Sequence, residues 1–446
     1  MKIPATPPPF EDGLRSLLER FHEEEDFEAF DREVMKGPAP DGAYRHWDTI
    51  RRIPPPGGLT AEDVWVARKV ARRGLYRPIP LLDRNGRPFQ YALVDPVLIR
   101  LHRIDRDAAG HIALPEQATS PETRERYIIR SLVEEAITSS QLEGAATTRE
   151  VAKEMIRTGR DPRDRSERMI LNNYRAMQHI RVRLGEPLTP DFVFDLHGIV
   201  SEGMLDTDGG PLRSPGDGIA VYDDRDPLLH LPPPAEEIEG RMQRMCAFAN
   251  EAETGVFLHP VLKSILLHFW LAYDHPFVDG NGRTARALFY WSMLKEGFWL
   301  AEYLSISRIL KRAPARYGKS FLYTETDDND LTYFILAQLR VIEQAIEELK
   351  DYLEKKVKEV AETRAILKPS SGLNHRQIAL LSHAIRHPGT AYTFESHRSS
   401  HGVAYATARA DLLDLNERGL LRLQRKGRKF VFVAVPDLSE RLRGME

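Results

Sequence analysis

The sequence predicts a mainly α-helical protein that ends in a small domain of a different pattern. Apolar residues recur at i, i+3 and i+4 through most of residues 121–361, which is the spacing of helices with one buried face. A linker rich in serine, proline and glycine follows at 367–374, and beyond it three short helical patterns precede a β-hairpin pattern. That order is typical of a winged helix. We therefore expect a helical core and a C-terminal winged helix-turn-helix domain.

Bulk composition narrows the functional classes. A chain of 446 residues with 42% hydrophobic residues predicts two or three domains with substantial cores. The net charge of -3 gives no general reason to expect nucleic-acid or membrane binding along the whole chain. Cys246 is the only cysteine, which excludes an internal disulfide and a multi-cysteine zinc site. Neither a signal-peptide pattern nor an apolar run of about 18 residues is present, so we expect a cytoplasmic protein without a membrane span.

We expect three regions, at 1–115, 116–365 and 366–446. The first looks loosely built, with an amphipathic segment followed by a proline-rich one. Thr60 is placed to begin a helix there, with Asp63 reaching back three residues later as in a capping box. The stretch FQYALVDPVLIRLHRI mixes β-branched and apolar residues, and its pattern fits either a short strand or a helix.

The central region contains the clearest helical patterns. One of them, SILLHFWLAYD, is apolar around most of its circumference, which predicts a helix buried at the centre of a bundle. The last is long, and its second half carries mostly glutamate and lysine on its polar face, as a solvated helix does. The five patterns cover residues 122–144, 166–184, 259–274, 283–297 and 331–364.

The stretch HPFVDGNGRTAR, at 275–286, joins two of these helices. Pro276 ends the first helix and the next begins near Asn281, so the loop is short and leads into a helix N-terminus. Free backbone N–H groups and the helix dipole attract anions at such a place. Gly280 and Gly282 allow the backbone to curl around a phosphate without a Cβ in the way. We therefore expect a backbone nest for phosphate here.

The side chains of the same stretch suit phosphoryl-type transfer. Arg283 and Arg286 lie three apart on one helix face and can clamp phosphate oxygens, while Asp279 can hold Mg²⁺ against them. An imidazole has an unperturbed pKa of about 6.5, so His275 can take the proton of a hydroxyl that attacks the phosphorus. Phe277 is expected to anchor the loop on the core. Taken singly, each residue also fits an ordinary polar loop between helices.

The pattern His-Pro-Phe-x-Asp-Gly-Asn-Gly-Arg-x-x-Arg resembles the signature of the Fic family, and the resemblance covers about residues 120–365. It implies an all-helical core that transfers AMP from ATP onto a protein hydroxyl. It implies that His275 is the base and Asp279 the Mg²⁺ ligand. It also implies that Gly280, Asn281 and Gly282 form the phosphate nest, and that Arg283 and Arg286 clamp the outer phosphates. Ala285 stands where many members have glycine. The intact Gly-Asn-Gly favours binding of a whole triphosphate.

The family also has an inhibitory motif, Ser/Thr-x-x-x-Glu-Gly/Asn, which Ser139, Glu143 and Gly144 match at the end of a helix near 124–144. This position resembles members whose inhibitory helix precedes the core. The resemblance implies that Glu143 pairs with Arg286 and occupies the space of the γ-phosphate, so that bound ATP is turned away from the attacking hydroxyl. A solvated glutamate at a helix end is the alternative interpretation.

Two short β-type runs, IAVY and LLHL, flank a turn-rich DDRDP and predict a hairpin. In Fic proteins a flap at this place clamps an extended target segment by adding a strand. The contacts implied by the resemblance are Val221 and Tyr222, or Leu229, His230 and Leu231. An ordinary surface hairpin is the alternative.

Two other patterns are rejected as sites. RYGKSF has Ala313 where the leading glycine of a P-loop is required, and no strand precedes it. His259, His268 and His275 lie 9 and 7 residues apart, which does not suit zinc ligands on one helix turn. We expect His268, inside an apolar helix, to be a satisfied core histidine.

The C-terminal tail is basic, with 12 Lys or Arg against 7 Asp or Glu over residues 373–446. RLQRKGRK would form a basic wing with Gly427 at the tip of the hairpin, and YATARADL a recognition helix that binds DNA. Docking of a protein, or a homodimer contact, is the competing interpretation.

For the whole chain the leading hypothesis is an autoinhibited protein adenylyltransferase that uses ATP and Mg²⁺ to modify a Ser, Thr or Tyr hydroxyl. Removal of AMP from a modified protein, and a DNA-binding regulator that senses nucleotide, are the alternatives.

Overall fold

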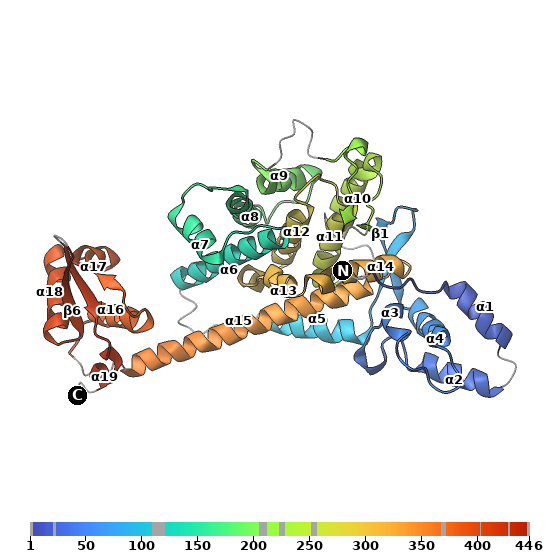
Figure 1. Ribbon diagram of the computed structural model, residues 1–446, viewed down its shortest axis with the longest axis horizontal. Coiled ribbons are helices and arrows are strands. Elements are labelled where there is room, and N and C mark those ends of the chain that lie inside the picture. The colour runs from blue at the N-terminus through green and yellow to red at the C-terminus, as the bar shows by residue number, and fades with distance from the viewer. Residues whose placement is uncertain are drawn as a thin grey trace. The chain divides into compact units, whose positions relative to one another are not determined.

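The computed structural model describes residues 3–20, 24–108, 121–204, 212–222, 228–250, 257–366, 372–401, 403–426 and 429–443. The chain divides into two compact units, Met1–Leu349 and Lys350–Glu446. Helices dominate both units, as predicted, and the strands of the described residues form three small sheets (Figure 1). Most of the predicted linker at 367–374 and the hairpin tip at Gly427 lie outside the described residues.

In the described residues, the N-terminal elements are four α-helices with one short 3-10 turn among them, then a hairpin and a fifth α-helix. The predicted capping box begins α4, since Thr60 accepts a hydrogen bond from the Asp63 backbone and Asp63 accepts one from that of Thr60. The ambiguous stretch at 89–104 contains both a strand and a helix. The bounds are α1 (Phe10–Arg20), α2 (Glu24–Met35), η1 (Pro40–Gly42), α3 (Trp47–Ile50), α4 (Ala61–Arg73), β1 (Tyr76–Leu82), β2 (Pro88–Ala92) and α5 (Asp95–Ala108).

The prediction that this region is loosely built was wrong, because buried charges on α4 fix it to later helices. The Lys69 ammonium lies 2.7 Å from the Asp327 carboxylate, and both side chains are almost fully buried. Arg72, also buried, donates to the hydroxyl of Tyr333 at 2.8 Å and covers the ring of Tyr44 at 3.8 Å. Sequence periodicity shows the amphipathic helices but gives no sign of Asp327 and Tyr333, which lie 258 and 261 positions from Lys69 and Arg72.

The central bundle surrounds α11 and α12. Buried residues occur on every side of α11, from Val261 to Asp274, which confirms the predicted central helix. The antiparallel pair packs against α6, α8, α9 and α10 around one large hydrophobic core (Figure 1). The bounds are α6 (Pro121–Leu142), α7 (Arg149–Thr158), α8 (Arg165–Val182), α9 (Pro190–Ser201), α10 (Ile238–Asn250), α11 (Pro260–Asp274) and α12 (Asn281–Lys295).

Three further helices close the region. They follow η5 (Trp299–Tyr303) and are α13 (Ile306–Arg312), α14 (Pro314–Thr326) and α15 (Thr332–Ile366). The stretch RYGKSF lies inside α14, so it is helical and cannot form a P-loop. Short 3-10 turns η3 (Pro215–Asp217) and η4 (Ala235–Glu237) flank the predicted hairpin, in which β3 (Val221–Tyr222) pairs antiparallel with β4 (Leu228–His230). The turn at 223–227 lies outside the described residues.

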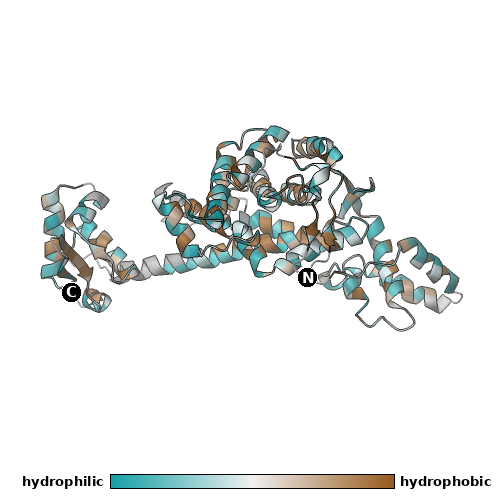
Figure 2. Ribbon diagram, turned by 45° about the horizontal axis from the view of Figure 1, so that its top comes forward, coloured by the Kyte–Doolittle hydropathy of each residue, from teal (hydrophilic) through white to brown (hydrophobic). Residues whose placement is uncertain are grey.

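The C-terminal unit has its own core. A three-stranded sheet of order β5-β7-β6 packs on helices through buried residues such as Leu381, Leu412 and Phe432. Figure 2 shows hydrophobic residues gathered in this sheet. The short strand β5 had no sequence signal, whereas the three helices and the hairpin follow the predicted order. The bounds are α16 (His375–Arg386), β5 (Ala391–Tyr392), α17 (Phe394–His401), α18 (Tyr405–Glu417), β6 (Leu421–Lys426), β7 (Lys429–Ala434) and α19 (Leu438–Arg443).

Among the described residues, no helix has both the length and the apolar composition needed to cross a membrane.

Replacing Asp327 with alanine should strongly destabilise the N-terminal region, because it leaves Lys69 buried without its principal counter-charge. We expect a loss of about 3–5 kcal/mol in the free energy of unfolding, measured by urea denaturation followed by circular dichroism. Glu11→Ala is the control, because Glu11 pairs with Arg73 at the surface and its loss should cost less than about 1 kcal/mol. Equal effects from the two variants would contradict this account of the buried pair.

Candidate active site

The site begins where α11 ends, at a left-handed turn on His275. Its φ of 47° and ψ of 54° are unusual for a residue with a Cβ. The turn reverses the chain after Asp274 and leaves the imidazole at the end of the central helix. Such a conformation costs about 1–3 kcal/mol and persists where surrounding contacts fix it.

Arg213 supplies those contacts, although no sequence pattern pointed to it. Its Nε donates to the carbonyl of His275 at 2.8 Å, and its Nη2 donates to the carbonyls of Pro233 and Asp274. The backbone N–H of Arg213 also donates to the carbonyl of Pro276. Arg213, which precedes the flap by only eight residues, therefore holds the chain on both sides of the left-handed turn.

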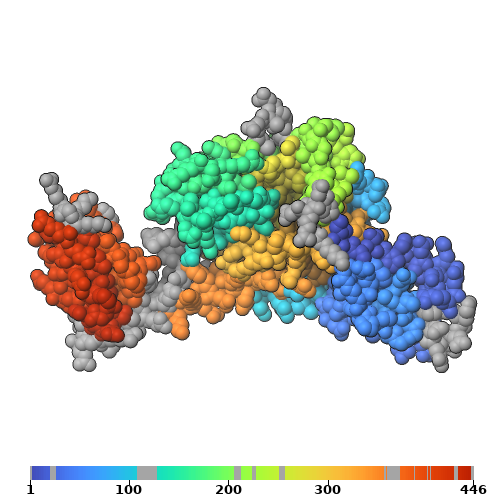
Figure 3. Space-filling view, in the orientation of Figure 1, coloured from blue at the N-terminus to red at the C-terminus, as the bar shows by residue number. Residues whose placement is uncertain are grey.

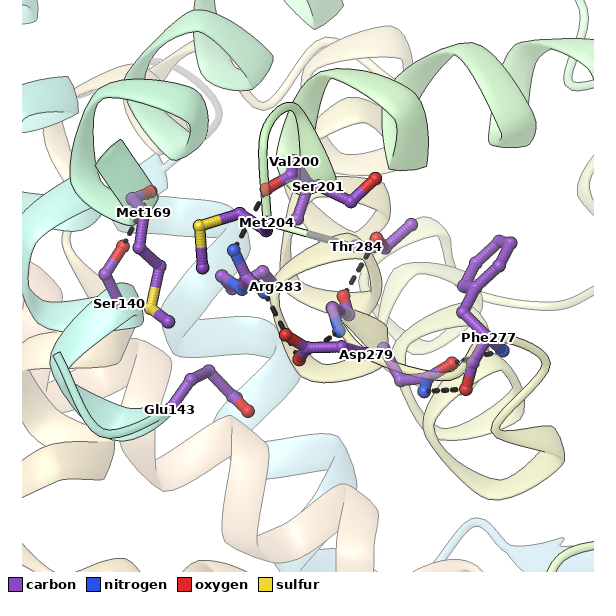
Figure 4. A network of polar contacts seen from close by, with 12 residues as sticks. Ser140, Glu143, Met169, Val200, Ser201, Met204, Phe277, Asp279, Arg283 and Thr284 are labelled. Atoms are coloured by element: carbon purple, nitrogen blue, oxygen red, sulfur yellow. Dashed lines mark hydrogen bonds and ion pairs between the residues drawn. The ribbon is translucent and has the colours of Figure 1, made fainter. Parts of the chain in front are cut away.

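The loop that follows is closed on itself by Asn281. Its side chain accepts from the backbone N–H of Phe277 at 2.9 Å and donates to the carbonyl of the same residue at 2.8 Å (Figure 4). Phe277 is fully buried and stacks on the ring of His197 with centroids 3.7 Å apart, in agreement with its predicted anchoring role. His197, which sequence reasoning missed, also bonds through Nε2 to the carbonyl of Asp279.

The nest lies at the start of α12. Gly280 has a φ of 87° and caps the helix without a side chain, so backbone N–H groups of the first turn remain open to an anion. A Cβ at Gly280 would come within 3.3 Å of Val200 and 3.4 Å of His197. At Gly282 a Cβ would overlap a carboxylate oxygen of Glu143. A carboxylate therefore lies against the backbone that we expect to bind phosphate.

Asp279 and Arg283 form a pair at the edge of the nest. One oxygen of Asp279 accepts from the backbone of Gly280 at 2.6 Å and from Arg283 Nη2 at 3.3 Å. Its other oxygen accepts from Arg165 at 3.3 Å. Arg283 is fully buried and donates to the carbonyl of Val200 at 3.0 Å, so in this structure it orients Asp279 and the end of α9 (Figure 4).

Arg286 makes the contact predicted for the inhibitory motif. Its Nη2 donates to the Glu143 carboxylate at 2.7 Å, and its Nε and Nη2 also donate to the hydroxyl and carbonyl of Ser139. Gly144, two residues past the end of α6, has the left-handed φ of 92° expected of a helix stop. Burial opposes the charge of Arg286, but the nearby Glu143 raises its pKa above the ordinary value.

A cleft of about 230 Å³ connects these groups. Its lining brings together the turn, the start of α12, the end of α6 and the β3–β4 hairpin, through His275, Gly282, Arg286, Glu143, Val221, Leu229 and His230. Burial lowers the pKa of His275 to about 4, so the imidazole is neutral at physiological pH and able to accept a proton. Two of the flap residues named from the sequence, Tyr222 and Leu231, are exposed outside this lining.

His230 requires a correction to its predicted docking role. Its side chain is buried and points inward, where Nδ1 lies 2.8 Å from the Glu325 carboxylate and Nε2 lies 2.7 Å from the carbonyl of Tyr273. The alternation of side chains along a strand explains this, because Leu229 and Leu231 flank it on the other face. His230 therefore fixes β4 to α14 and α11.

The acidic side chains of the site bear on whether a divalent cation could bind. The described residues contain no cluster of three or more acidic, histidine or cysteine side chains able to hold a metal. Mg²⁺, however, is commonly held by one or two carboxylates together with substrate phosphates. The Asp279 side chain is about one-third exposed beside the nest, so it fits as the protein ligand of a phosphate-bound Mg²⁺.

The segment that contains this site is similar to a known family of domains. Residues 187–293, which include the turn and the nest, match the model of the Fic/DOC family. The chain carries a Fic domain. Its relatives include the protein adenylyltransferase Fic of Nematostella vectensis, 27% identical over 36% of this chain and 37% of that protein. The protein of the same name from Drosophila mojavensis is 29% identical over 45% of this chain and 38% of its own length. The chain thus spans less than two fifths of these curated relatives.

Solved structures share the Fic fold. A crystal structure of a Fic family protein from Desulfovibrio desulfuricans G20 superposes with a TM-score of 0.53 at 19% identity. The match covers 77% of this chain and 97% of that protein, so it extends well beyond the Fic domain.

His268 should make the stability of the Fic domain depend on pH. It is fully buried against Tyr317, and burial lowers its pKa to about 3, whereas an unfolded histidine titrates near 6.5. The unfolded chain therefore binds a proton that the folded chain does not, and stability falls as pH decreases from about 6.5 toward 3.

Between pH 7.5 and 4.5 the free energy of unfolding should thus fall less steeply for His268→Gln than for the parent, by up to about 1.4 kcal/mol per pH unit. The thermal midpoint, measured over the same range, should show the same difference in slope. The matched control is His102→Gln, since His102 is exposed. If the His268→Gln slope equals that of the parent and the control, the buried histidine is not the cause.

Proposed function

We propose that the chain is a protein adenylyltransferase that transfers AMP from ATP to a Ser, Thr or Tyr hydroxyl, and that Glu143 inhibits it. The observation that carries the proposal is the contact of the Glu143 carboxylate with both Gly282 and Arg286. An anion already lies where the motif predicts phosphate. The names of the curated relatives support the choice of reaction.

Once Glu143 has moved away from Gly282 and Arg286, which we call the open state, the nest would bind the phosphates of ATP. Gly280 lets the backbone curl, Asn281 and Gly282 supply N–H donors at the start of α12, and Arg286 becomes available to the outer phosphates once Glu143 leaves. Arg283 would act indirectly, by holding Asp279 in place. The side chain of Asn281 would keep its bonds to Phe277, so it shapes the loop without contacting ATP.

The transfer itself needs little beyond positioning and a base. Nε2 of His275 would accept the proton as the target oxygen forms a bond to the α-phosphorus, and the bond from that phosphorus to pyrophosphate breaks. The neutral imidazole that burial maintains is the form required for this step. Arg213 would keep the imidazole in position through the carbonyl of His275. When bound, Mg²⁺ supplies charge neutralisation to the phosphates, and Asp279 would hold it.

The flap would dock the target beside His275. Val221 and Leu229 line the cleft, and the buried bonds of His230 to Glu325 and Tyr273 hold the strand pair in place. The exposed Tyr222 and Leu231 offer apolar contacts at the same edge. An extended target segment could therefore add a strand there and present its hydroxyl to the base.

Autolabelling with α-³²P-ATP and Mg²⁺ tests the proposal. Glu143→Gly should label at least tenfold more than the parent, and adding His275→Ala should abolish the label. Glu186→Gly is the matched control, because it removes an exposed glutamate outside the cleft and should label like the parent. If none of the proteins labels although ATP binds, AMP transfer is refuted and a nucleotide-sensing regulator takes its place.

The pH profile tests the role of His275 separately. Because burial lowers its pKa to about 4, the initial labelling rate of Glu143→Gly should stay within twofold between pH 7.5 and 5.5. An ordinary imidazole with a pKa of 6.5 would lose about tenfold over that range. Removal of Glu143 takes away a charge that raises the pKa of His275, so the variant shifts the profile further toward acid. A tenfold loss centred near pH 6.5 would contradict a buried base.

A further inference from the structure

A second and larger cavity lies on the other side of α14 from the active-site cleft. It is a groove of about 560 Å³ between α14 and α15, closed at one end by residues 43–49 and along one side by α13. This volume is typical of sites for small organic ligands. Figure 3 shows α13 and α14, in yellow to light orange, meeting the orange surface of α15 and the blue N-terminal surface on the face in view.

The charge of the groove has one sign. Four cationic side chains line it, from Arg45, Arg316, Lys319 and Arg340, and none of its lining residues among those the structure describes is an aspartate or glutamate. Nor does any of the four make an ion pair with a carboxylate in the described part of the chain. Elsewhere in this unit arginines and lysines are commonly ion-paired, as Arg312 on α13 is with Glu348. An uncompensated positive groove with low-dielectric walls attracts anions.

The remaining lining is aromatic and apolar. His46 and Tyr323 stack with centroids 4.3 Å apart, and Tyr44 and Tyr333 meet edge to face beside them. Flat rings such as these pack well against an aromatic ligand. The Gln338 side chain also lines the groove, and it is 3% exposed with no hydrogen-bond partner for Nε2 in the described residues. A buried amide without a partner is costly, and a ligand acceptor would satisfy it.

The spacing along α14 places these features on one face. Arg316, Lys319 and Tyr323 are three and four residues apart, so they form a continuous stripe. The lining of α14 from Ala315 to Tyr323 covers a rise of about 12 Å, the length of a small molecule with a ring at one end and an acidic group at the other. The groove is separate from the proposed ATP site, and Tyr317 is the side chain that lines both cavities.

We propose that this groove binds a small aromatic anion, with its ring against the histidine and tyrosines and its acidic group between Arg316 and Lys319. The inference does not depend on the proposed transfer of AMP, because it rests on the charge, the aromatic lining and the unpartnered amide of a different cavity. The hydroxyl of Tyr317 is hydrogen-bonded to Nε2 of His268 within the Fic core. A ligand in the groove would therefore contact Tyr317, a residue that belongs to the core.

Thiol protection in the full chain tests the site. The single native cysteine, Cys246, is buried and burial raises the pKa of its thiol to about 12, so it reacts slowly with a maleimide. Gln344→Cys places an exposed thiol in the lining of the groove. The probe is 8-anilinonaphthalene-1-sulfonate, an aromatic sulfonate, and the readout is the rate of alkylation by N-ethylmaleimide. Thr49→Cys, at the aromatic end, is a second reporter if the first is poorly folded.

We expect a saturating probe to slow alkylation of Gln344→Cys at least fivefold and to leave Ser16→Cys, exposed on α1, unchanged. Adding Arg316→Glu and Lys319→Glu should abolish protection, whereas the charge-matched control Arg15→Glu with Arg84→Glu, at exposed positions outside the groove, should retain it. The proposal is overturned if the probe does not protect or if protection survives the groove charge reversal. It is equally overturned if sodium sulfate alone protects as well as the aromatic probe, since the rings would then contribute nothing.

Discussion

The backbone of His275 turns into a left-handed conformation that only its surroundings can maintain, and the geometry of the whole site follows from that turn. Arg213 fixes it by binding the carbonyls on either side, and Asn281 closes the loop that comes next. With both ends fixed, α12 starts at one defined place. The imidazole, the nest and Arg286 then take their relative positions from two rigid helices instead of from a flexible loop.

The sequence predicted those parts of the site that are adjacent in the chain. Residues 275–286 contain the proposed base, the proposed phosphate nest and Arg286 within twelve positions, and short spacing on a helix translates directly into geometry. The pairing of Glu143 with Arg286 was predicted only through the resemblance to a family motif, and the contact is present. Arg213 and His197 could not be predicted, because each is a single residue whose role depends on a distant backbone carbonyl.

The same distinction applies to the fold. Long helices such as α11 and α15 were predicted because their apolar period repeats over several turns. The two-residue strand β5 carries too few positions for a period to appear, whereas the equally short β3 was predicted only because a turn-rich segment and a second β-type run follow it. The N-terminal region was misjudged for another reason, since its order comes from buried Lys69 and Arg72 meeting partners near the start of α15. Composition and periodicity indicate how polar a segment is, but they do not indicate which distant residues it contacts.

Two of the buried cations show how such side chains join separate helices. Arg72 connects α4 to α15, and Arg286 connects α12 to α6. A buried charge is tolerated only with its partners in place, so each arginine specifies one arrangement of its helices more strictly than apolar packing does. The difference is that the partners of Arg72 are enclosed, whereas the carboxylate of Glu143 is about one-third exposed and can be reached from the cleft.

The absence of a side chain at Gly282 affects which mutations would inactivate the protein and which would activate it. The space beside this residue holds a carboxylate now and would hold a phosphate in the open state, so any larger residue at 282 removes both occupants at once. If Glu143 inhibits as we propose, a larger residue at 282 inactivates the protein, whereas changes at the end of α6 that remove Glu143 release Arg286 and leave the nest intact. Random variation in this gene should then give loss of activity at Gly282 and raised activity at Glu143.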